Sequence, residues 1–216
     1  MRLAPEGRPF VAGAGTVLAI LALVAGWRGG WWLSAAAVWL ALTLWVVAFF
    51  RDPSREGPRG EQLVIAPADG RVTEVSEVRE PDFIRGPALR ISVFMNVFDV
   101  HVNRHPADGI VAYREYRAGR FLNATLDKAS DENERMSLGV RTHRGPVLVR
   151  QIAGLIARRI VTDAREGDAV RQGARLGMIR FGSRVDTLLP AGAAAIRVRA
   201  GERTRAGQTV IAEWNT

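Results

Sequence analysis

The sequence predicts a mainly β domain, with α+β as the alternative fold class, preceded by an N-terminal transmembrane helical hairpin. Two observations predict this. Residues 10–50 carry a single charge, and from residue 62 onward short apolar runs alternate with polar residues between Gly, Pro and Asp. The first pattern is typical of membrane helices and the second of strands joined by tight turns. We therefore expect an anchor at 1–50, a linker at 51–61 and a globular domain at 62–216.

The anchor consists of two uncharged runs, 10–27 and 31–50, separated by Arg28-Gly29-Gly30. Each run approaches the roughly 20 residues that a helix needs to cross a bilayer. Arginines lie before the first run and after the second, and only Arg28 lies between them, so the positive-inside rule predicts both ends in the cytoplasm. We expect the inner cell membrane, with the globular domain on its cytoplasmic face. A cleaved secretory signal peptide and a shallow re-entrant anchor are the alternatives.

Composition excludes several kinds of chemistry. The chain has no cysteine, which excludes disulfides, thiolate metal sites and cysteine nucleophiles. The net charge of +8 is almost entirely arginine, because Lys128 is the only lysine. A cofactor held as a lysine imine, such as pyridoxal phosphate, would have to use Lys128. The arginine excess favours an anionic partner, and the membrane anchor favours phospholipid over nucleic acid.

In the domain, strands are expected wherever β-branched and apolar residues alternate. These segments are 63–66, 71–75, 89–97, 109–113, 147–153, 157–161, 178–181, 194–198 and 209–213. A helix over 152–160 is an alternative, although β-branched residues and Gly154 oppose it.

Two internal repeats indicate a compact architecture of glycine turns. Pro67–Gly70 and Pro106–Gly109 are both Pro-Ala-Asp-Gly, and Gly167–Gly173 is echoed by Gly201–Gly207. Such turns join short strands, and the pattern resembles the barrel-sandwich fold of lipoyl and biotinyl carrier domains. Because no lysine lies in either repeat, a carrier function is not expected.

Few residues could perform acid-base or nucleophilic chemistry. Asp99, His101 and Asn103 alternate after a strongly apolar run, so they would share one face of an extended chain and could form an active-site wall. A structural histidine at a strand end is the alternative for His101. His105 precedes a proline and is expected to be structural. No third metal ligand accompanies the two histidines, so no metal site is expected.

Two further motifs would be read as ordinary turns if each were considered alone. Asp69 and Asp108 precede glycines in the repeated Pro-Ala-Asp-Gly turns, and a Gly-Ser pair such as Gly182-Ser183 is most simply a turn as well. The polar excursion at 127–135 is either a solvated loop or a loop over a site.

Taken together, these segments resemble the phosphatidylserine decarboxylases, specifically the short bacterial and archaeal branch of this pyruvoyl-dependent family. The segments that carry the resemblance are Phe49–Pro53, Ala66–Gly70, Val93–Met95, Asp99–Arg104, Gly119–Ala124, Lys128–Ser130, Asn133–Arg135, Gln151–Gly154 and Gly177–Asp186. They cover roughly residues 49–190 in the family's order.

The resemblance implies a proenzyme that cuts itself between Gly182 and Ser183, giving a β chain (1–182) and an α chain (183–216) that stay associated; it also allows a homodimer. Ser183 would become a covalent pyruvoyl group, which forms a Schiff base with the serine phospholipid. Neither a metal nor pyridoxal phosphate is then needed.

The family's base and its acidic partner correspond to His101 and Asp69, so the implied catalytic residues are Ser183, His101 and Asp69. Long members carry a second histidine three residues after the first, where this chain has Arg104. They also have Leu-Gly-Ser-Thr at the cut, where this chain has Phe-Gly-Ser-Arg. Which candidate residue is the base for self-cleavage, and which is the proton donor in decarboxylation, stays open.

The expected reaction is decarboxylation of phosphatidylserine to phosphatidylethanolamine and CO2. One alternative is the same chemistry on an archaeal-type ether serine lipid. Another is a non-catalytic, membrane-tethered β-domain that binds anionic lipid.

Overall fold

The computed structural model describes residues 2–119, 133–154, 159–180 and 183–215, and the chain divides into two compact units, Met1–Ser54 and Arg55–Thr216. Each unit is described by itself below.

The first unit is a helical hairpin. It contains β1 (Arg2–Leu3), a 3-10 turn η1 (Pro5–Gly7), α1 (Arg8–Arg28), α2 (Trp31–Phe49) and β2 (Arg51–Asp52). Gly29 and Gly30 reverse the chain with φ of 61° and 59°, a region that glycine enters without steric cost. The Trp39 indole Nε1–H donates to the Ala14 carbonyl at 2.9 Å, so α1 and α2 are in contact. Both helices are long and apolar enough to cross a membrane.

The second unit is built from strands, which confirms the predicted mainly β fold. The strands are β3 (Leu63–Ile65), β4 (Gly70–Glu80), β5 (Gly86–Met95), β6 (Val102–Arg104), β7 (Gly109–Arg117), β8 (Arg135–Arg141), β9 (Pro146–Ala153), β10 (Ile160–Thr162), β11 (Ala169–Val170), β12 (Arg175–Ile179), β13 (Ser183–Pro190), β14 (Ala194–Ile196), β15 (Arg203–Thr204) and β16 (Val210–Trp214).

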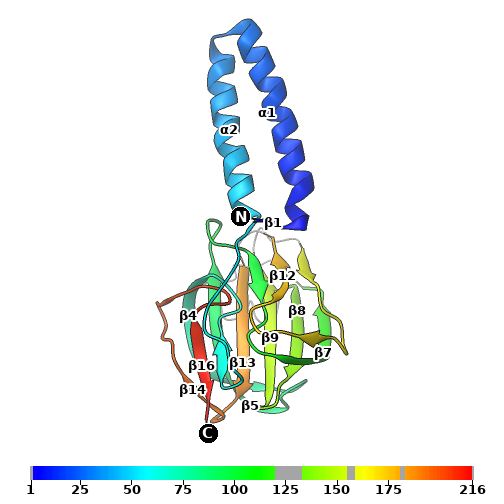
Figure 1. Cartoon of the computed structure of the whole chain (residues 1–216), viewed down its shortest axis with the longest axis vertical. Helices are drawn as coiled ribbons and strands as arrows, with labels where there is room; N and C mark the ends of the chain where they lie inside the picture. Colours follow the sequence, from blue (N-terminus) through cyan, green and yellow to red (C-terminus); the bar gives the residue numbers. More distant parts are fainter. Residues whose placement is uncertain (1, 120–132, 155–158, 181–182, 216) are drawn as a thin grey trace. The chain divides into compact units, whose positions relative to one another are not determined.

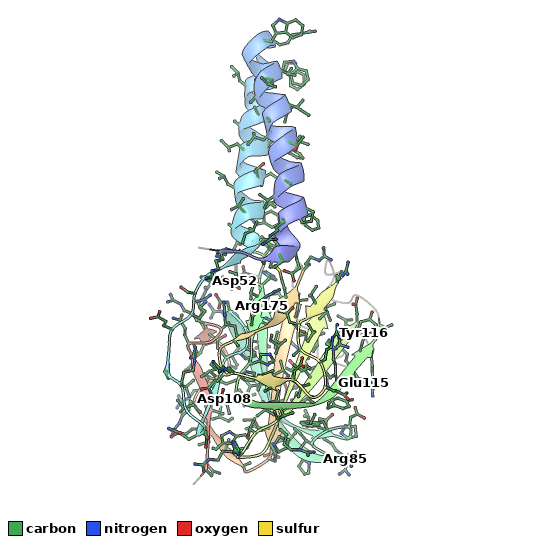
Figure 2. The ribbon with its side chains drawn as sticks, turned by 45° about the vertical axis from the view of Figure 1, so that its right-hand side comes forward. Asp52, Arg85, Asp108, Glu115, Tyr116 and Arg175 are labelled. Carbon is green, nitrogen blue, oxygen red and sulfur yellow. The ribbon has the colours of Figure 1, made fainter. Side chains whose placement is uncertain are left out.

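Within the described residues the strands form one large antiparallel sheet and two small ones. The large sheet has the order β11-β7-β8-β9-β13-β5-β4-β15 and curls into a half-barrel (Figure 1). The small sheets are β10-β12-β6 and β14-β16-β3. The main core joins apolar side chains of all three sheets, including Val64, Val93, Val149, Leu176 and Val185.

The sheet order reveals a twofold internal repeat centred between β9 and β13. Reading outward from this centre, β8, β7 and β11 on one side correspond to β5, β4 and β15 on the other, and the two small sheets correspond to each other. One half of the repeat is β6–β12. The other half combines β3–β5 with β13–β16, so the segment from Ser183 onward completes a half that the chain began before β6.

The turns that are repeated in the sequence lie at corresponding positions in the two halves. Gly70 and Gly109 have φ of 150° and 158°, and at each a Cβ would collide with a backbone carbonyl, that of Phe94 or of Arg141. Glycine is therefore required at both positions. The register also shifts at matching places, after Val72 in β4 and after Val111 in β7.

Five strands of the second unit and several boundaries were not predicted from the sequence; the unpredicted strands are β6, β8, β11, β13 and β15. β8 begins next to the charged stretch 127–135, and β13 begins at the Gly-Ser pair that resembles a turn. At 152–160, strand β9 continues to Ala153 and β10 begins at Ile160, while residues 155–158 lie outside the described range.

Candidate active site

Ser183 is the first residue of β13, in the middle of the large sheet. Its Cα partners are Met95, the last residue of β5, and Ala153, the last residue of β9. Figure 1 shows β13 in orange running inside the sheet. Ser183 therefore lies at one end of the half-barrel with a strand on each side. We call this end, defined by Ser183, Met95 and Ala153, the Ser183 end.

The Ser183 side chain lies on the core face of the sheet. Side chains alternate along a strand, so Ser183 shares its face with Val185 and Leu189, both members of the main core. The residue is fully buried, and its Oγ has no hydrogen-bond partner among the described residues. A buried hydroxyl without a partner is costly in free energy, so each such case needs its own explanation.

The next residue, Arg184, points to the opposite face. Its Nε lies 2.9 Å from Asp186 Oδ1, and its Nη2 donates to Asp186 Oδ2 at 3.1 Å, with both side chains almost fully buried. This pair fixes the start of β13 on the face away from Ser183 Oγ.

His101 reaches the Ser183 end through the loop that follows β5. Met95, the neighbour of Ser183, leads into Asn96, whose N–H donates to Asp99 Oδ2 at 2.9 Å. The fully buried His101 follows, and its carbonyl accepts a hydrogen bond of 3.4 Å from Ile179 N–H, four residues before Ser183. The backbone of His101 is therefore hydrogen-bonded to β12, the strand that precedes the candidate cleavage site.

A hydrogen bond defines the tautomer of His101. Nδ1 lies 3.0 Å from the carbonyl oxygen of Asp99. A carbonyl oxygen can only accept, so Nδ1 carries the proton in the neutral ring and Nε2 is the nitrogen that can take one up. A backbone carbonyl, rather than a carboxylate, therefore orients this imidazole.

Side-chain amides hold the strands around Ser183. Thr162 Oγ1 donates to Gln151 Oε1 at 2.7 Å, Gln151 Nε2 donates to Asn103 Oδ1 at 2.8 Å, and Asn103 Nδ2 lies 3.6 Å from Met95 Sδ. On the other side, Asn133 Nδ2 donates to the Ala153 carbonyl at 2.8 Å. Both Cα partners of Ser183 are thus fixed by asparagine side chains.

Asp69 also lies at the Ser183 end, because it precedes β4 two strands away from β13. Two strand spacings amount to roughly 10 Å. Its Oδ1 accepts from the Ala206 N–H at 2.7 Å and its Oδ2 from Arg55 Nη2 at 2.6 Å. The hydrogen bonds of this carboxylate therefore go to a turn and to an arginine.

Asp108, the counterpart of Asp69 in the internal repeat, shows which of these contacts is structural. Its Oδ1 accepts from the Gln172 N–H at 2.9 Å, and Gln172 corresponds to Ala206 in the second turn repeat. The Oδ1 contact is thus common to both halves. The ion pair with Arg55 belongs to the Asp69 half, with side chains only 10% and 14% exposed.

His105 lies apart from Ser183, in the other half of the repeat. It is 2% exposed, and its backbone pairs with Gly173 and Ala174. Burial lowers the pKa of the imidazole from 6.5 to about 4, so the ring is neutral at physiological pH. These surroundings support the structural role expected for His105. In the part of the chain that the structure describes, no three acidic or histidine side chains come together as a metal site.

Two open pockets lined by described residues do not include Ser183. The larger, of about 640 Å3, is lined by Arg114, Thr162, Asp163, Arg165 and Glu166. Another, of about 420 Å3, extends along residues 163–175 and includes His105. Mixed charges line both, and neither contains His101 or Ser183.

The sequence did not point to Arg55, Gln151 or Thr162 as individual site residues. Arg55 belongs to the Pro/Gly-rich stretch read as a linker, where an arginine carries no signal, yet it pairs with Asp69. Gln151 was part of a motif, but its link to Thr162 depends on the three-dimensional arrangement. Gly182 and Lys128 lie outside the described residues.

Comparison with known proteins completes the description. The family model described as phosphatidylserine decarboxylase matches residues 42–212. Three similar proteins are each named phosphatidylserine decarboxylase proenzyme. The protein of Symbiobacterium thermophilum is 52% identical over 97% of this chain and 94% of its own length. Those of Aromatoleum aromaticum and Nitrosomonas europaea are 50% and 49% identical, over 98% and 99% of this chain and 95% of their own lengths.

Proposed function

Because this chain belongs to the phosphatidylserine decarboxylase family and is a carboxy-lyase, we propose that it matures by cutting itself between Gly182 and Ser183 and then converts phosphatidylserine to phosphatidylethanolamine and CO2. The relatives' name, proenzyme, supports the maturation step. The observation that carries the proposal is the buried Ser183 Oγ, which has no hydrogen-bond partner among the described residues and stands at the first position of a central strand.

In the first step Ser183 Oγ attacks the carbonyl carbon of Gly182, and the amide becomes an ester as the Ser183 nitrogen leaves. Loss of the Ser183 α-proton then expels the Gly182 carboxylate and leaves dehydroalanine. One water hydrolyses this residue, with release of ammonia, to a pyruvoyl group at position 183.

Ser183 needs a base to become a nucleophile. His101 is the residue that we assign to this role, because its Nδ1–H is held by the Asp99 carbonyl and Nε2 can accept the proton. Asp69 contributes a negative charge at the same end of the sheet, where the Arg55 guanidinium holds it in place.

The surroundings of Ser183 fit a pyruvoyl group. The side chain faces an apolar core at a strand end, and Asn103 and Asn133 fix both neighbouring strands. When bound, a pyruvoyl group supplies a ketone that withdraws electrons as the substrate carboxylate leaves as CO2. His101 is also the candidate to return a proton to the product, from Nε2.

The two apolar helices and the lipid nature of the proposed substrate support membrane association. We further propose the cytoplasmic face of the cell membrane as the site of the catalytic domain, because arginines flank the hairpin on both outer sides.

The test is the intact mass of the purified protein. Self-cleavage should give fragments of 182 and 34 residues, the smaller one blocked at its first residue. Ser183→Ala should abolish both cleavage and release of CO2 from phosphatidylserine.

Ser92→Ala is the matched control. Ser92 is a fully buried serine in the adjacent strand β5, and its Oγ also has no hydrogen-bond partner among the described residues. This variant should still be cleaved. A single unbroken chain in active wild-type material would refute the pyruvoyl proposal.

A further inference from the structure

Phe98 is an exposed aromatic residue beside a buried site. Its side chain is 71% exposed, the highest value for any large apolar residue in the described part of Arg55–Thr216. It lies in the loop between Met95, the neighbour of Ser183, and His101. Exposing a phenylalanine to water is unfavourable, so its position at the tip of this loop requires an explanation.

The loop holds Phe98 in one position. The Phe98 N–H donates to Asn96 Oδ1 at 2.8 Å, the Asn96 N–H donates to Asp99 Oδ2 at 2.9 Å, and the Asp99 N–H donates to the Asn96 carbonyl at 3.0 Å. These bonds form a tight turn stabilised by side chains. Because the Asp99 carbonyl also accepts from His101, the turn that presents Phe98 is the one that orients the candidate base.

Two exposed arginines lie beside this loop. Arg203 in β15 is the Cα partner of Arg71 in β4, and its Nη1 lies 3.9 Å from Asp99 Oδ1. The Arg203 side chain is 69% exposed. We call Phe98, Arg71 and Arg203 the Phe98 rim.

The internal repeat provides a comparison for these charges. The counterpart of Arg71 is Ile110, and the counterpart of Arg203 is Ala169, which pair with each other in the same way. The positions that are arginine at the Ser183 end are thus apolar in the other half. The neighbouring acidic residues do not differ in this way, since Glu202 corresponds to Asp168. The basic pair is therefore specific to the end that carries Ser183.

We propose that the Phe98 rim docks on an anionic lipid bilayer, with the Phe98 ring in the interfacial region and Arg71 and Arg203 against lipid phosphates. Aromatic rings favour the membrane interface, and arginines near an anionic leaflet are attracted to it. This inference rests on the proposed function, because a lipid whose headgroup must reach position 183 has to meet the domain at this end. It identifies the end of the domain that faces the membrane.

The absence of cysteine makes the test direct. The full chain carrying Phe98→Cys is labelled with nitrobenzoxadiazole and reconstituted in vesicles of phosphatidylcholine and phosphatidylglycerol. We expect lipids spin-labelled on the acyl chain to remove most of the fluorescence and aqueous iodide to have little effect. Ile110→Cys, also an exposed apolar position, should show the reverse.

Accessibility of label 98 to iodide, with no lipid quenching, would overturn the proposal. Val97→Cys provides a second reporter in the same loop if the first variant does not fold. In vesicles of phosphatidylcholine alone, quenching by lipid should fall, and equal quenching in both vesicles would overturn the role of the two arginines.

Decarboxylation of detergent-dispersed phosphatidylserine, measured on the unlabelled wild-type chain, separates the two proposals. Lipid quenching at position 98 without decarboxylation would support docking and overturn the proposed function. Decarboxylation with an iodide-accessible label at position 98 would support the proposed function and overturn docking.

Discussion

At the scale of single residues, the two buried histidines have different environments. His101 donates through Nδ1 to a carbonyl, whereas Nδ1 of His105 is buried without a hydrogen-bond partner among the described residues. An imidazole that cannot be solvated resists protonation, and burial therefore lowers the pKa of His105 from 6.5 to about 4. Between these two pH values the unfolded chain binds a proton that the folded chain does not.

His105 should therefore make the protein less stable in acid. Because the folded-state pKa is the lower one, stability is lost as the pH falls below 6.5, and the loss is complete near pH 4. Between pH 7 and pH 5 the free energy of unfolding should drop by about 2 kcal/mol from this group. His105→Leu should remove this part of the pH dependence in thermal unfolding experiments. Replacement of the exposed His143 should leave it in place, and an unchanged pH profile in His105→Leu would contradict the assignment.

Site residues were predictable where the chemistry demands a rare residue type. With three histidines and no cysteine, His101 and Ser183 stood out once their motifs were considered together. The contacts of Asp69 were not predictable, because its partners, Arg55 and Ala206, are 14 and 137 residues away. Nothing local marks an arginine or a backbone amide as the partner of a distant carboxylate.

At the scale of structural elements, the two Pro-Ala-Asp-Gly turns form a natural control experiment. Both place an aspartate Oδ1 on the backbone of a second glycine turn, and both are followed by a glycine against a neighbouring strand. They differ because one turn lies at the Ser183 end and is paired with Arg55.

Asp69→Asn and Asp108→Asn should therefore separate stability from activity. Each weakens a charge-assisted hydrogen bond to a backbone amide, so each should cost about 1 kcal/mol of unfolding free energy, and Asp69→Asn somewhat more because Arg55 loses its partner. Cleavage and decarboxylation should fall about 100-fold or more in Asp69→Asn alone. Equal activities of the two variants, measured as CO2 release, would show that Asp69 has only the structural role.

Elements were predicted best where one periodicity extends over many residues. The helices at 10–27 and 31–50 were predicted, and the structure has them at Arg8–Arg28 and Trp31–Phe49. Strand β13 was missed although it is central. It is buried on both faces, its polar residues Arg184 and Asp186 satisfy each other, and the alternation that identifies a half-exposed strand is therefore absent.

At the scale of the whole β unit, the proposed cleavage site lies at the start of a strand that is paired on both sides. β13 pairs with β5 over eight residues and with β9 over six. The 34 residues from Ser183 onward also supply β14, β15 and β16, which complete one half of the internal repeat.

After the proposed cleavage, the fragments 1–182 and 183–216 should remain one particle. They should co-elute in size-exclusion chromatography in detergent and separate only in denaturant, because removing β13 would open the large sheet in its middle. Uncleaved Ser183→Ala protein provides the reference elution volume. Elution of the small fragment by itself under native conditions would contradict the expected association.

The internal repeat could be inferred from the two sequence echoes, but the segments of the chain that form each half could not. Both echoes were visible as short identical or similar turns. That one half is made of two separated parts of the chain, β3–β5 and β13–β16, depends on pairings between residues more than 100 positions apart, such as Arg71 with Arg203. Sequence periodicity reports only neighbours along the chain.

The position of β13 has a further consequence for how long the mature protein lasts. Refolding of one uncut chain is a reaction whose rate does not depend on concentration. If the bond before Ser183 is cut as proposed, recovery from unfolding requires two separate polypeptides to meet, and the smaller one can diffuse away. In dilute solution each unfolding event then becomes a permanent loss, so the working lifetime of the enzyme is set by its unfolding rate rather than by its folding equilibrium.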